Sequence, residues 1–99
     1  QYEYPSATER YARIAAYLGL GGANDAAKTE NLCRAIDELK AKVGMPASIK
    51  DWGVDEKEFL SRVDSLSEEA FDDQCTGANP RFPLIAEIKE LCLDAYYGR

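Results

Sequence analysis

The feature that most restricts the fold of this chain is a series of apolar patterns with helical period, separated by glycine and proline. In residues 5–19, four apolar residues recur at positions i, i+3, i+4 and i+7: Tyr11, Ile14, Ala15 and Leu18. This spacing places them on one face of a helix. Ser6 and Glu9 have the spacing of a capping box, and Gly19 is suited to end the helix. We therefore predict a first helix over residues 5–19.

A second helical pattern follows the glycine-rich residues 19–23. Asn24 can cap this helix, whose apolar stripe consists of Leu32, Ile36, Leu39 and Val43. Gly44 and Pro46 then stop the helix. The glycine run resembles a phosphate-binding loop only superficially, because such a loop follows a strand and a helix precedes it here. We interpret it as a linker between helices.

The second half of the chain begins with a connector over residues 46–54. Within it, Ser48 and Asp51 have capping-box spacing, which predicts a single helical turn. Trp52 in this connector is a packing anchor or an interface residue, and we expect the anchor.

Three further helices are predicted after the connector. Asp55 with Glu58 opens a third helix, and Ser67 is expected to cap a short fourth helix over residues 68–74. The last helix runs from near Pro83 to Gly98. Its apolar residues cover more than half of its circumference, which is typical of a central helix.

These patterns predict an all-α fold with about five helices in a compact orthogonal or bundle-like array, and no convincing strand. A length of 99 residues fits one domain, so we expect residues 1–99 to form a single all-helical domain.

The charge of the chain excludes several classes of partner. A formal net charge of -6 and a pI near 4.6 disfavour binding to nucleic acid and to an anionic membrane surface. No apolar run is long enough to span a bilayer. The amino end lacks the basic start and apolar core of a signal peptide. A start at Gln1 suggests a processed or excised piece.

The chain contains no histidine, which excludes the commonest catalytic arrangements. A Ser-His-Asp triad, a Cys-His dyad and a histidine metal ligand cannot be supplied from within it. Chemistry would have to use carboxylates, Lys, Tyr or a lone Cys.

Three well-separated cysteines cannot form a complete disulfide framework, so we expect a reducing compartment and a cytoplasmic location. Cys33 and Cys92 lie on or next to apolar stripes and are expected in the core. Cys75 lies where a helix gives way to a loop. A helix carboxyl end disfavours a thiolate, so a lining or packing role fits Cys75 better than nucleophilic catalysis.

The stretch DDQCTGANPR, residues 72–81, carries the most concentrated set of candidate functional residues. The acids Glu68, Glu69, Asp72 and Asp73 could do acid-base work or hold a hard cation, although clustered helical acids are mostly solvated. Asp72 and Asp73 fall near a helix carboxyl end, where negative charge is unfavourable. We therefore expect Arg81 to form an ion pair with one of them and to brace the loop.

Residues 70–99, AFDDQCTGANPRFPLIAEIKELCLDAYYGR, closely resemble the end of the alcohol dehydrogenase half of bifunctional aldehyde–alcohol dehydrogenases, members of the iron-dependent alcohol dehydrogenase family. The resemblance extends back through VDEKEFLSRVDSLSE, AIDELKAKVGMPASIKDWGV and QYEYPSATERYARIAAYLGL, and covers essentially the whole chain. Phe82 is often Tyr in relatives.

The resemblance implies a place for this chain in a larger enzyme. Family members have an α/β dinucleotide-binding domain and a C-terminal helical domain, and hold metal through one aspartate and three histidines. The chain resembles the last part of that helical domain, so no metal ligand or dinucleotide loop can be transferred to it. The resemblance makes Cys75, Thr76 and Gly77 lining residues of the substrate pocket. Asp72, Asp73, Asn79 and Arg81 are then expected to brace the loop.

The leading functional hypothesis is thus a C-terminal helical segment of an NAD- and iron-dependent alcohol dehydrogenase that interconverts acetaldehyde and alcohol in fermentation. The segment would supply scaffold and part of the pocket wall, and would not catalyse alone. Its partners would be the remainder of the parent enzyme, its oligomer or filament, and a small alcohol or aldehyde substrate. The alternatives are a freestanding acidic helical protein-interaction module and a redox-sensing thiol protein built on Cys75.

Overall fold

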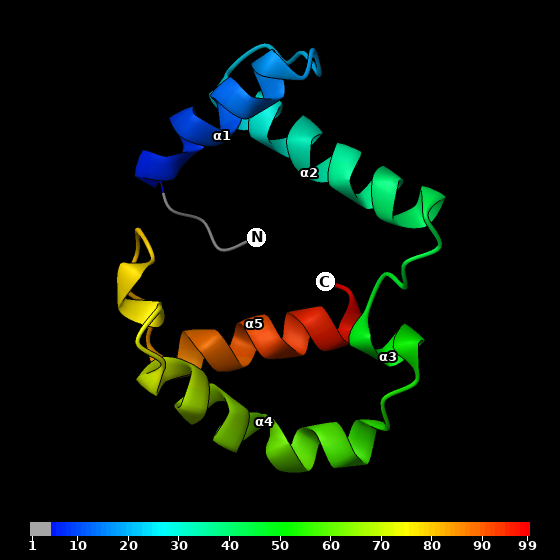
Figure 1. Ribbon diagram of the computed structural model, residues 1–99, viewed down its shortest axis with the longest axis vertical. Coiled ribbons are helices and arrows are strands. Elements are labelled where there is room, and N and C mark those ends of the chain that lie inside the picture. The colour runs from blue at the N-terminus through cyan, green and yellow to red at the C-terminus, as the bar shows by residue number, and fades with distance from the viewer. Residues whose placement is uncertain (1–4) are drawn as a thin grey trace. The chain divides into compact units, whose positions relative to one another are not determined.

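The computed structural model describes the backbone of residues 5–99 and the side chains from Ala7 onward (Figure 1). Within these residues the secondary structure is entirely helical, with five α-helices, one 3-10 helix and no strand. The predicted all-α class is confirmed. The helices form two compact units, Gln1–Met45 and Pro46–Arg99.

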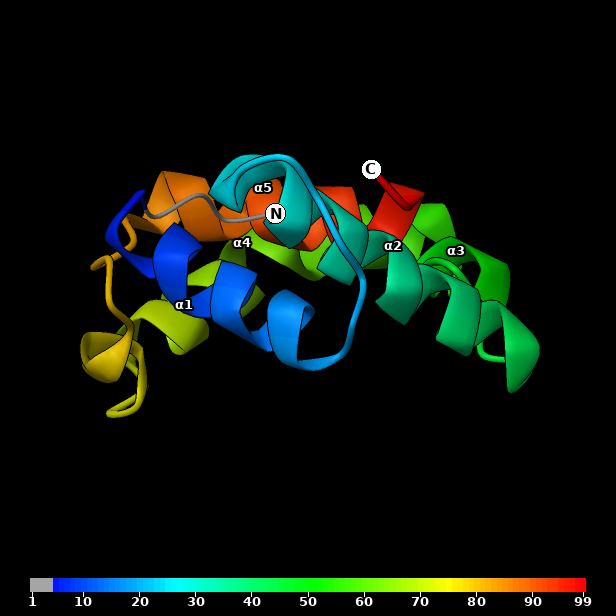
Figure 2. The ribbon, with the colours of Figure 1, turned by 90° about the horizontal axis from the view of Figure 1, so that it is seen from above.

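The first unit consists of α1, Pro5–Tyr17, and α2, Asp25–Lys42. The chain between them runs back along α1, so that α2 begins beside α1 (Figure 2). The Oγ1 atom of Thr29 accordingly donates to the carbonyl of Thr8 at 3.3 Å. Asn31 holds the connecting loop through hydrogen bonds from Nδ2 to the carbonyls of Leu20, at 3.4 Å, and Gly21, at 3.1 Å.

Small side chains form the contact between α1 and α2. Ala7, Ala12 and Ala15 of α1 are buried, as is Leu32 of α2. Alanine lets two helix backbones approach closely, but a seam of alanines buries little apolar area. Most of the two predicted apolar stripes therefore remains exposed. Of their eight residues only Ala15 and Leu32 are buried, and large members such as Leu39 are more than half exposed.

The predicted start of α2 is confirmed. Asn24 has extended backbone angles, and its side-chain oxygen accepts from the N–H of Ala27 at 2.9 Å. α1 begins at Pro5, one residue before Ser6, and the expected capping role of the Ser6 side chain lies outside the described residues.

The second unit consists of α3, Ile49–Trp52, α4, Glu56–Asp72, a 3-10 helix η1, Thr76–Ala78, and α5, Ile85–Tyr97. α4 and α5 lie side by side and run in opposite directions (Figure 1). The single turn predicted after Pro46 is confirmed as α3, where the hydroxyl of Ser48 accepts from the N–H of Asp51 at 3.0 Å.

The core of the second unit is built on Phe59, Val63 and Tyr96. The rings of Phe59 and Tyr96 are stacked, with centroids 4.3 Å apart and an angle of 19° between their planes. The Tyr96 hydroxyl donates to the carbonyl of Val54 at 2.8 Å, so its polar end is satisfied. Cys92 packs against this core, which joins α5 to α4.

The predicted break between a third and a fourth helix is wrong. α4 is continuous, and Ser67 lies within it with 0% exposure. The Ser67 hydroxyl donates to the carbonyl of Val63, one turn earlier, at 2.6 Å. A serine that bonds back in this way can lie within a helix, and its position four and eight residues after Val63 and Phe59 places it on the buried face.

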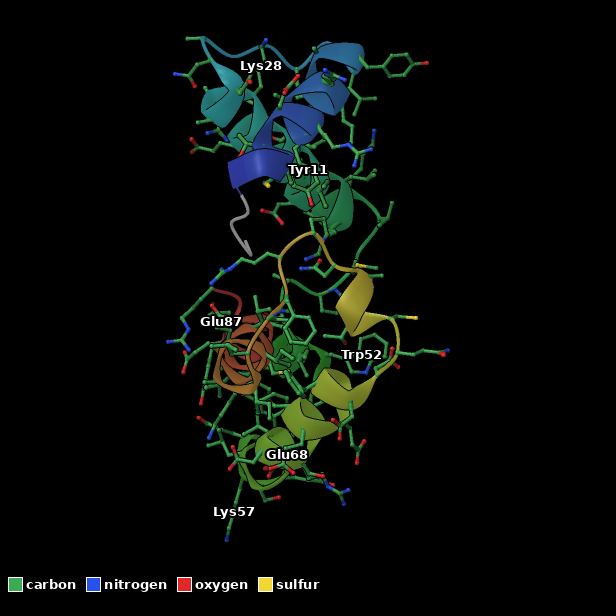
Figure 3. The ribbon with its side chains drawn as sticks, turned by 90° about the vertical axis from the view of Figure 1, so that its left-hand side faces the viewer. Tyr11, Lys28, Trp52, Lys57, Glu68 and Glu87 are labelled. Atoms are coloured by element: carbon green, nitrogen blue, oxygen red, sulfur yellow. The ribbon has the colours of Figure 1, made fainter. Side chains whose placement is uncertain are left out.

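The side chains expected in the interior are more accessible than predicted. Trp52, labelled in Figure 3, is 75% exposed, so the packing-anchor expectation is wrong. Cys33 and Cys92 are half-buried, whereas Cys75 is exposed. Trp52 is the last residue of the four-residue helix α3, and Ile49 is the residue of this helix that packs against the core.

Candidate functional site

The predicted site residues gather in the segment that joins α4 to α5. α4 ends at Asp72, because the next residue, Asp73, has extended backbone angles of -63° and 131°. The Asp73 carboxylate accepts from the N–H of Cys75 at 2.7 Å, the local turn that aspartate favours. The chain therefore turns sharply away from the helix and presents Cys75 at the turn.

Thr76 fastens this turn to the helix that precedes it. Its hydroxyl donates to the carbonyl of Ala70 in the last turn of α4, and its N–H donates to the carbonyl of Asp73 at 3.0 Å. The N–H of Asn79 donates to the carbonyl of Thr76 at 3.2 Å and closes η1. Residues 73–79 are therefore tied to the carboxyl end of α4.

The second half of the segment is tied to α5 instead. The side-chain amide of Asn79 donates to the carbonyl of Arg81, and the guanidinium of Arg81 donates to Glu87 in the first turn of α5. Within residues 5–99 no ion pair joins Arg81 to Asp72 or Asp73, so the predicted partner is wrong. After Asp73 the chain passes through η1 before it reaches Arg81, whose guanidinium binds the following helix rather than the preceding one.

An aromatic pair also bridges the two ends of the segment. Phe71 in the last turn of α4 meets Phe82 edge to face, with ring centroids 5.6 Å apart and an interplanar angle of 81°. This geometry is favoured by the ring quadrupoles. Phe82 remains 57% exposed, so the pair lies at the surface of the unit.

The side chains that the family resemblance marks as pocket lining are accessible. Cys75 and Gly77 are exposed and Thr76 is half-buried. A Cβ atom built on Gly77 would meet no heavy atom within 4 Å, so the space beside this glycine is open. Thr76 keeps its hydroxyl engaged with α4, and the thiol of Cys75 is the more available group.

The described residues do not fit an iron centre. The chain has no histidine, and among residues 5–99 no three Cys, Asp or Glu side chains converge so that they could hold a metal ion. The cluster of acids near the end of α4 (Glu68, Glu69, Asp72 and Asp73) therefore does not form the cation site that was one interpretation of it. Among the described helices none is long and apolar enough to cross a bilayer.

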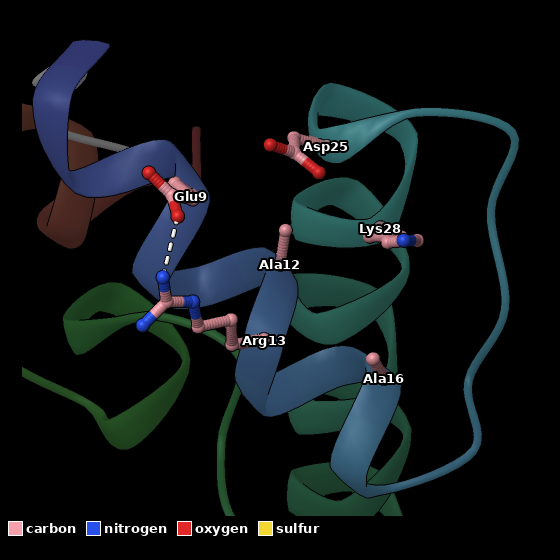
Figure 4. A pocket seen from close by; sticks show the side chains of 6 residues that line it. All are labelled: Glu9, Ala12, Arg13, Ala16, Asp25 and Lys28. Atoms are coloured by element: carbon pink, nitrogen blue, oxygen red, sulfur yellow. Dashed lines mark hydrogen bonds and ion pairs between the residues drawn. The ribbon is translucent and has the colours of Figure 1, made fainter.

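A shallow hollow of about 310 Å³ lies elsewhere, on the surface of the first unit (Figure 4). Its lining comes from α1 and α2: Glu9, Ala12, Arg13, Ala16, Asp25 and Lys28. Charges of both signs line it, and Arg13 is already paired with Glu9 at 2.6 Å. None of the predicted site residues lies in this hollow.

Sequence reasoning missed one residue of the site, Glu87. Its second carboxylate oxygen accepts from the N–H of Leu84 at 2.8 Å, which is half of a capping box. The spacing from residue 84 to residue 87 could have indicated this contact. The signal was hidden because leucine, at the cap position, has no side-chain acceptor.

Comparison with known proteins relates this site to an enzyme family. Residues 1–96 match the family model described as "Fe-containing alcohol dehydrogenase family, C-terminal". The bifunctional aldehyde-alcohol dehydrogenase of Escherichia coli K12 is 57% identical over 100% of this chain. The aldehyde-alcohol dehydrogenase of Clostridium acetobutylicum is 54% identical over 97% of the chain. The NADPH-dependent butanol dehydrogenase of Clostridium saccharobutylicum is 36% identical over 99% of the chain.

The matched regions are small parts of these relatives. The chain spans 11% of the length of the two aldehyde-alcohol dehydrogenases and 25% of the butanol dehydrogenase. The family model nevertheless matches nearly every residue, and more than half of the residues are identical in two relatives. This chain therefore belongs to the Fe-containing alcohol dehydrogenase family, whose C-terminal region it matches.

Proposed function

We propose that this chain serves as the C-terminal helical segment of an NAD- and iron-dependent alcohol dehydrogenase that interconverts acetaldehyde and alcohol in fermentation in the cytoplasm. In this role it supplies helical scaffold and part of the substrate-pocket wall. The family match over residues 1–96 carries the proposal. The names of two close relatives, which describe aldehyde-alcohol dehydrogenases, support the substrate class.

We propose that iron and NAD are held by other parts of such an enzyme. The chain has no histidine, and its described residues offer no converging set of metal ligands. We therefore expect the chain by itself to be inactive. The remainder of the parent enzyme is its necessary partner, and contacts in an oligomer or filament belong to the same proposal.

The wall is assigned to Cys75, Thr76 and Gly77. Cys75 and Gly77 are exposed although the backbone around them is fixed by hydrogen bonds to α4. A pocket wall needs this combination, because substrate must reach the side chains while the backbone keeps its shape. The contacts of Asp73, Asn79 and Arg81 support the bracing role expected of them, whereas among the described residues no contact of this kind supports Asp72.

Two measurements test this proposal. The first mixes the isolated chain with ferrous iron, NADH and acetaldehyde, and the expected result is no turnover; sustained NADH oxidation would overturn the scaffold role. The second compares Cys75→Leu with Cys75→Ser in the protein of full natural length. A larger side chain on the wall should raise KM for longer alcohols more than for ethanol. Cys33→Leu, a matched change far from the segment in sequence, should not alter this ratio.

One observation favours a second candidate, a freestanding acidic protein-interaction module. Each unit exposes large apolar side chains, including Tyr17 at 91% and Trp52 at 75%. Such groups are candidates for contact with other proteins. Sedimentation of the isolated chain discriminates the two functions. A stable, folded monomer that captures a partner without the rest of an alcohol dehydrogenase would favour the module.

A further inference from the structure

The carboxylate of Glu87 joins two segments that the proposed function treats separately. One oxygen accepts from the N–H of Leu84 at 2.8 Å, at the start of α5, and the other accepts from the guanidinium of Arg81. Glu87 is labelled on α5 in Figure 3. A single side chain therefore fixes both the first turn of its helix and the loop six residues before it.

The pair of Arg81 and Glu87 is the most protected ion pair of residues 5–99. The two side chains are 41% and 30% exposed, whereas every other pair has at least one partner that is 59% exposed or more. Solvent and salt screen exposed pairs strongly, and a partly buried, charge-assisted hydrogen bond is screened less. This pair is therefore better placed than the others to influence local structure.

The loop that contains Cys75 is anchored at both ends. On one side, Asp73 and Thr76 bind it to α4. On the other side, the side chain of Asn79 donates to the carbonyl of Arg81, and Arg81 is bound to Glu87. A continuous series of hydrogen bonds therefore links Glu87, through Arg81 and Asn79, to the turn that begins at Thr76.

We infer that Glu87 is a positioning residue, whose ion pair with Arg81 holds residues 75–81 in a single conformation from the α5 side. This effect of Glu87 on the loop conformation is inferred from these contacts alone. Its importance for substrate rests on the proposed function, in which the same residues form the pocket wall.

Glutamine at position 87 separates this role from simple helix capping. A capping box accepts Gln in place of Glu, because either side chain can accept the N–H at the cap position. Gln cannot provide the charge that strengthens the bond to Arg81. Glu87→Gln should therefore keep the start of α5 and loosen the loop, whereas Glu87→Ala should weaken both.

Peptide-resolved hydrogen exchange on the protein of full natural length tests the inference. In Glu87→Gln, amides of residues 75–81 should exchange about three- to ten-fold faster, and those of residues 85–92 should keep their rate. Arg81→Gln should give the same change, and the double variant should add little to either. The matched control is Glu90→Gln, which removes the same charge from an exposed position on the same helix.

Three outcomes would overturn the inference. If Glu87→Gln leaves exchange of residues 75–81 unchanged while Glu87→Ala accelerates residues 85–92, Glu87 is only a cap. If both variants accelerate exchange throughout the chain, the residue acts on global stability. If residues 75–81 stay protected in the control Glu90→Gln, the specific role of Glu87 is supported. If they lose protection in this control as well, that role is refuted.

Kinetics of the same variants separate this inference from the proposed function. If residues 75–81 form the pocket wall, Glu87→Gln should raise KM for alcohol by about two- to five-fold and change kcat by less than about two-fold. Faster exchange of residues 75–81 with an unchanged KM would support the positioning role of Glu87 and contradict the proposal that these residues line the substrate pocket. Unchanged exchange of residues 75–81 would refute the positioning role of Glu87, whatever the kinetics show.

Discussion

The stacked pair of Phe59 and Tyr96 gives the sharpest test of how the second unit is stabilised. Phe59 is 8% exposed, and its ring lies 4.3 Å from that of Tyr96. Phe59→Leu removes the stacking, which contributes about 0.5–1.5 kcal/mol, and leaves a small cavity. We expect the free energy of unfolding to fall by about 1–2 kcal/mol, with a decrease in Tm of about 4–8 °C for each kcal/mol.

The choice of leucine follows from the size of the unit. The second unit, Pro46–Arg99, has 54 residues. At the usual 0.05–0.15 kcal/mol per residue, such a unit is stable by roughly 3–8 kcal/mol. Phe59→Ala would cost about 3–5 kcal/mol and could leave no folded state to measure. Leucine keeps most of the buried apolar area, so that the transition remains observable.

The assay is urea unfolding followed by far-UV circular dichroism, with the slope m compared between variants. The matched control is Phe82→Leu, the same change in a ring that is 57% exposed and meets its partner edge to face. We expect that control to lower stability by less than about 0.5 kcal/mol. If Phe59→Leu costs no more than Phe82→Leu, the reasoning that places the core at the stacked pair is refuted.

Three further predictions concern pH, backbone conformation and packing. Burial, with the Glu56 and Asp55 carboxylates, raises the pKa of Tyr96, and the hydrogen bond to Glu56 raises the pKa of Tyr97. The unfolded state releases these protons first, so the contribution of the two tyrosines to stability should be fully present below about pH 10 and be lost as the pH rises further. Tyr97→Phe should reduce that slope in urea titrations. Gly22→Ala should lower the Tm in thermal unfolding more than Gly21→Ala. Both positions need positive φ, but only at Gly22 would the new Cβ lie 2.7 Å from the backbone of α2. Equal decreases in Tm would contradict the clash. Ser67→Leu should cost about 1–3 kcal/mol in urea unfolding because Ser67 is fully buried, and a neutral result would show that the site has spare volume.

Local rules predicted the helix starts well. Asn24, Ser48 and Asp55 each cap a helix through an N–H three residues later, at 2.9–3.0 Å. These contacts depend only on the backbone of the next turn, so sequence spacing is sufficient to find them. Ser67 is a serine like the cap residue Ser48, but its side chain is buried and its hydroxyl donates to the carbonyl of Val63. It therefore lies within α4 instead of starting a new helix.

Longer-range partners could not be predicted from spacing. The period of an apolar stripe identifies a helix face, but it does not say how much of that face a partner covers. Ile36 and Leu39 belong to a correctly identified stripe and are still about half exposed or more. Position in the sequence favours Asp72 or Asp73 as the partner of Arg81. The chain leaves α4 at Asp73 and passes through η1 before Arg81, and the partner is Glu87 of α5.

Trp52 has a practical consequence for every experiment that follows folding by light. It is the only tryptophan of the chain, and its indole is three-quarters exposed. Its fluorescence should therefore resemble that of tryptophan in water and change little when the core of the second unit melts. The same property makes it a reporter of association: a shift of its emission to shorter wavelength would signal that another surface has covered α3, without any added label.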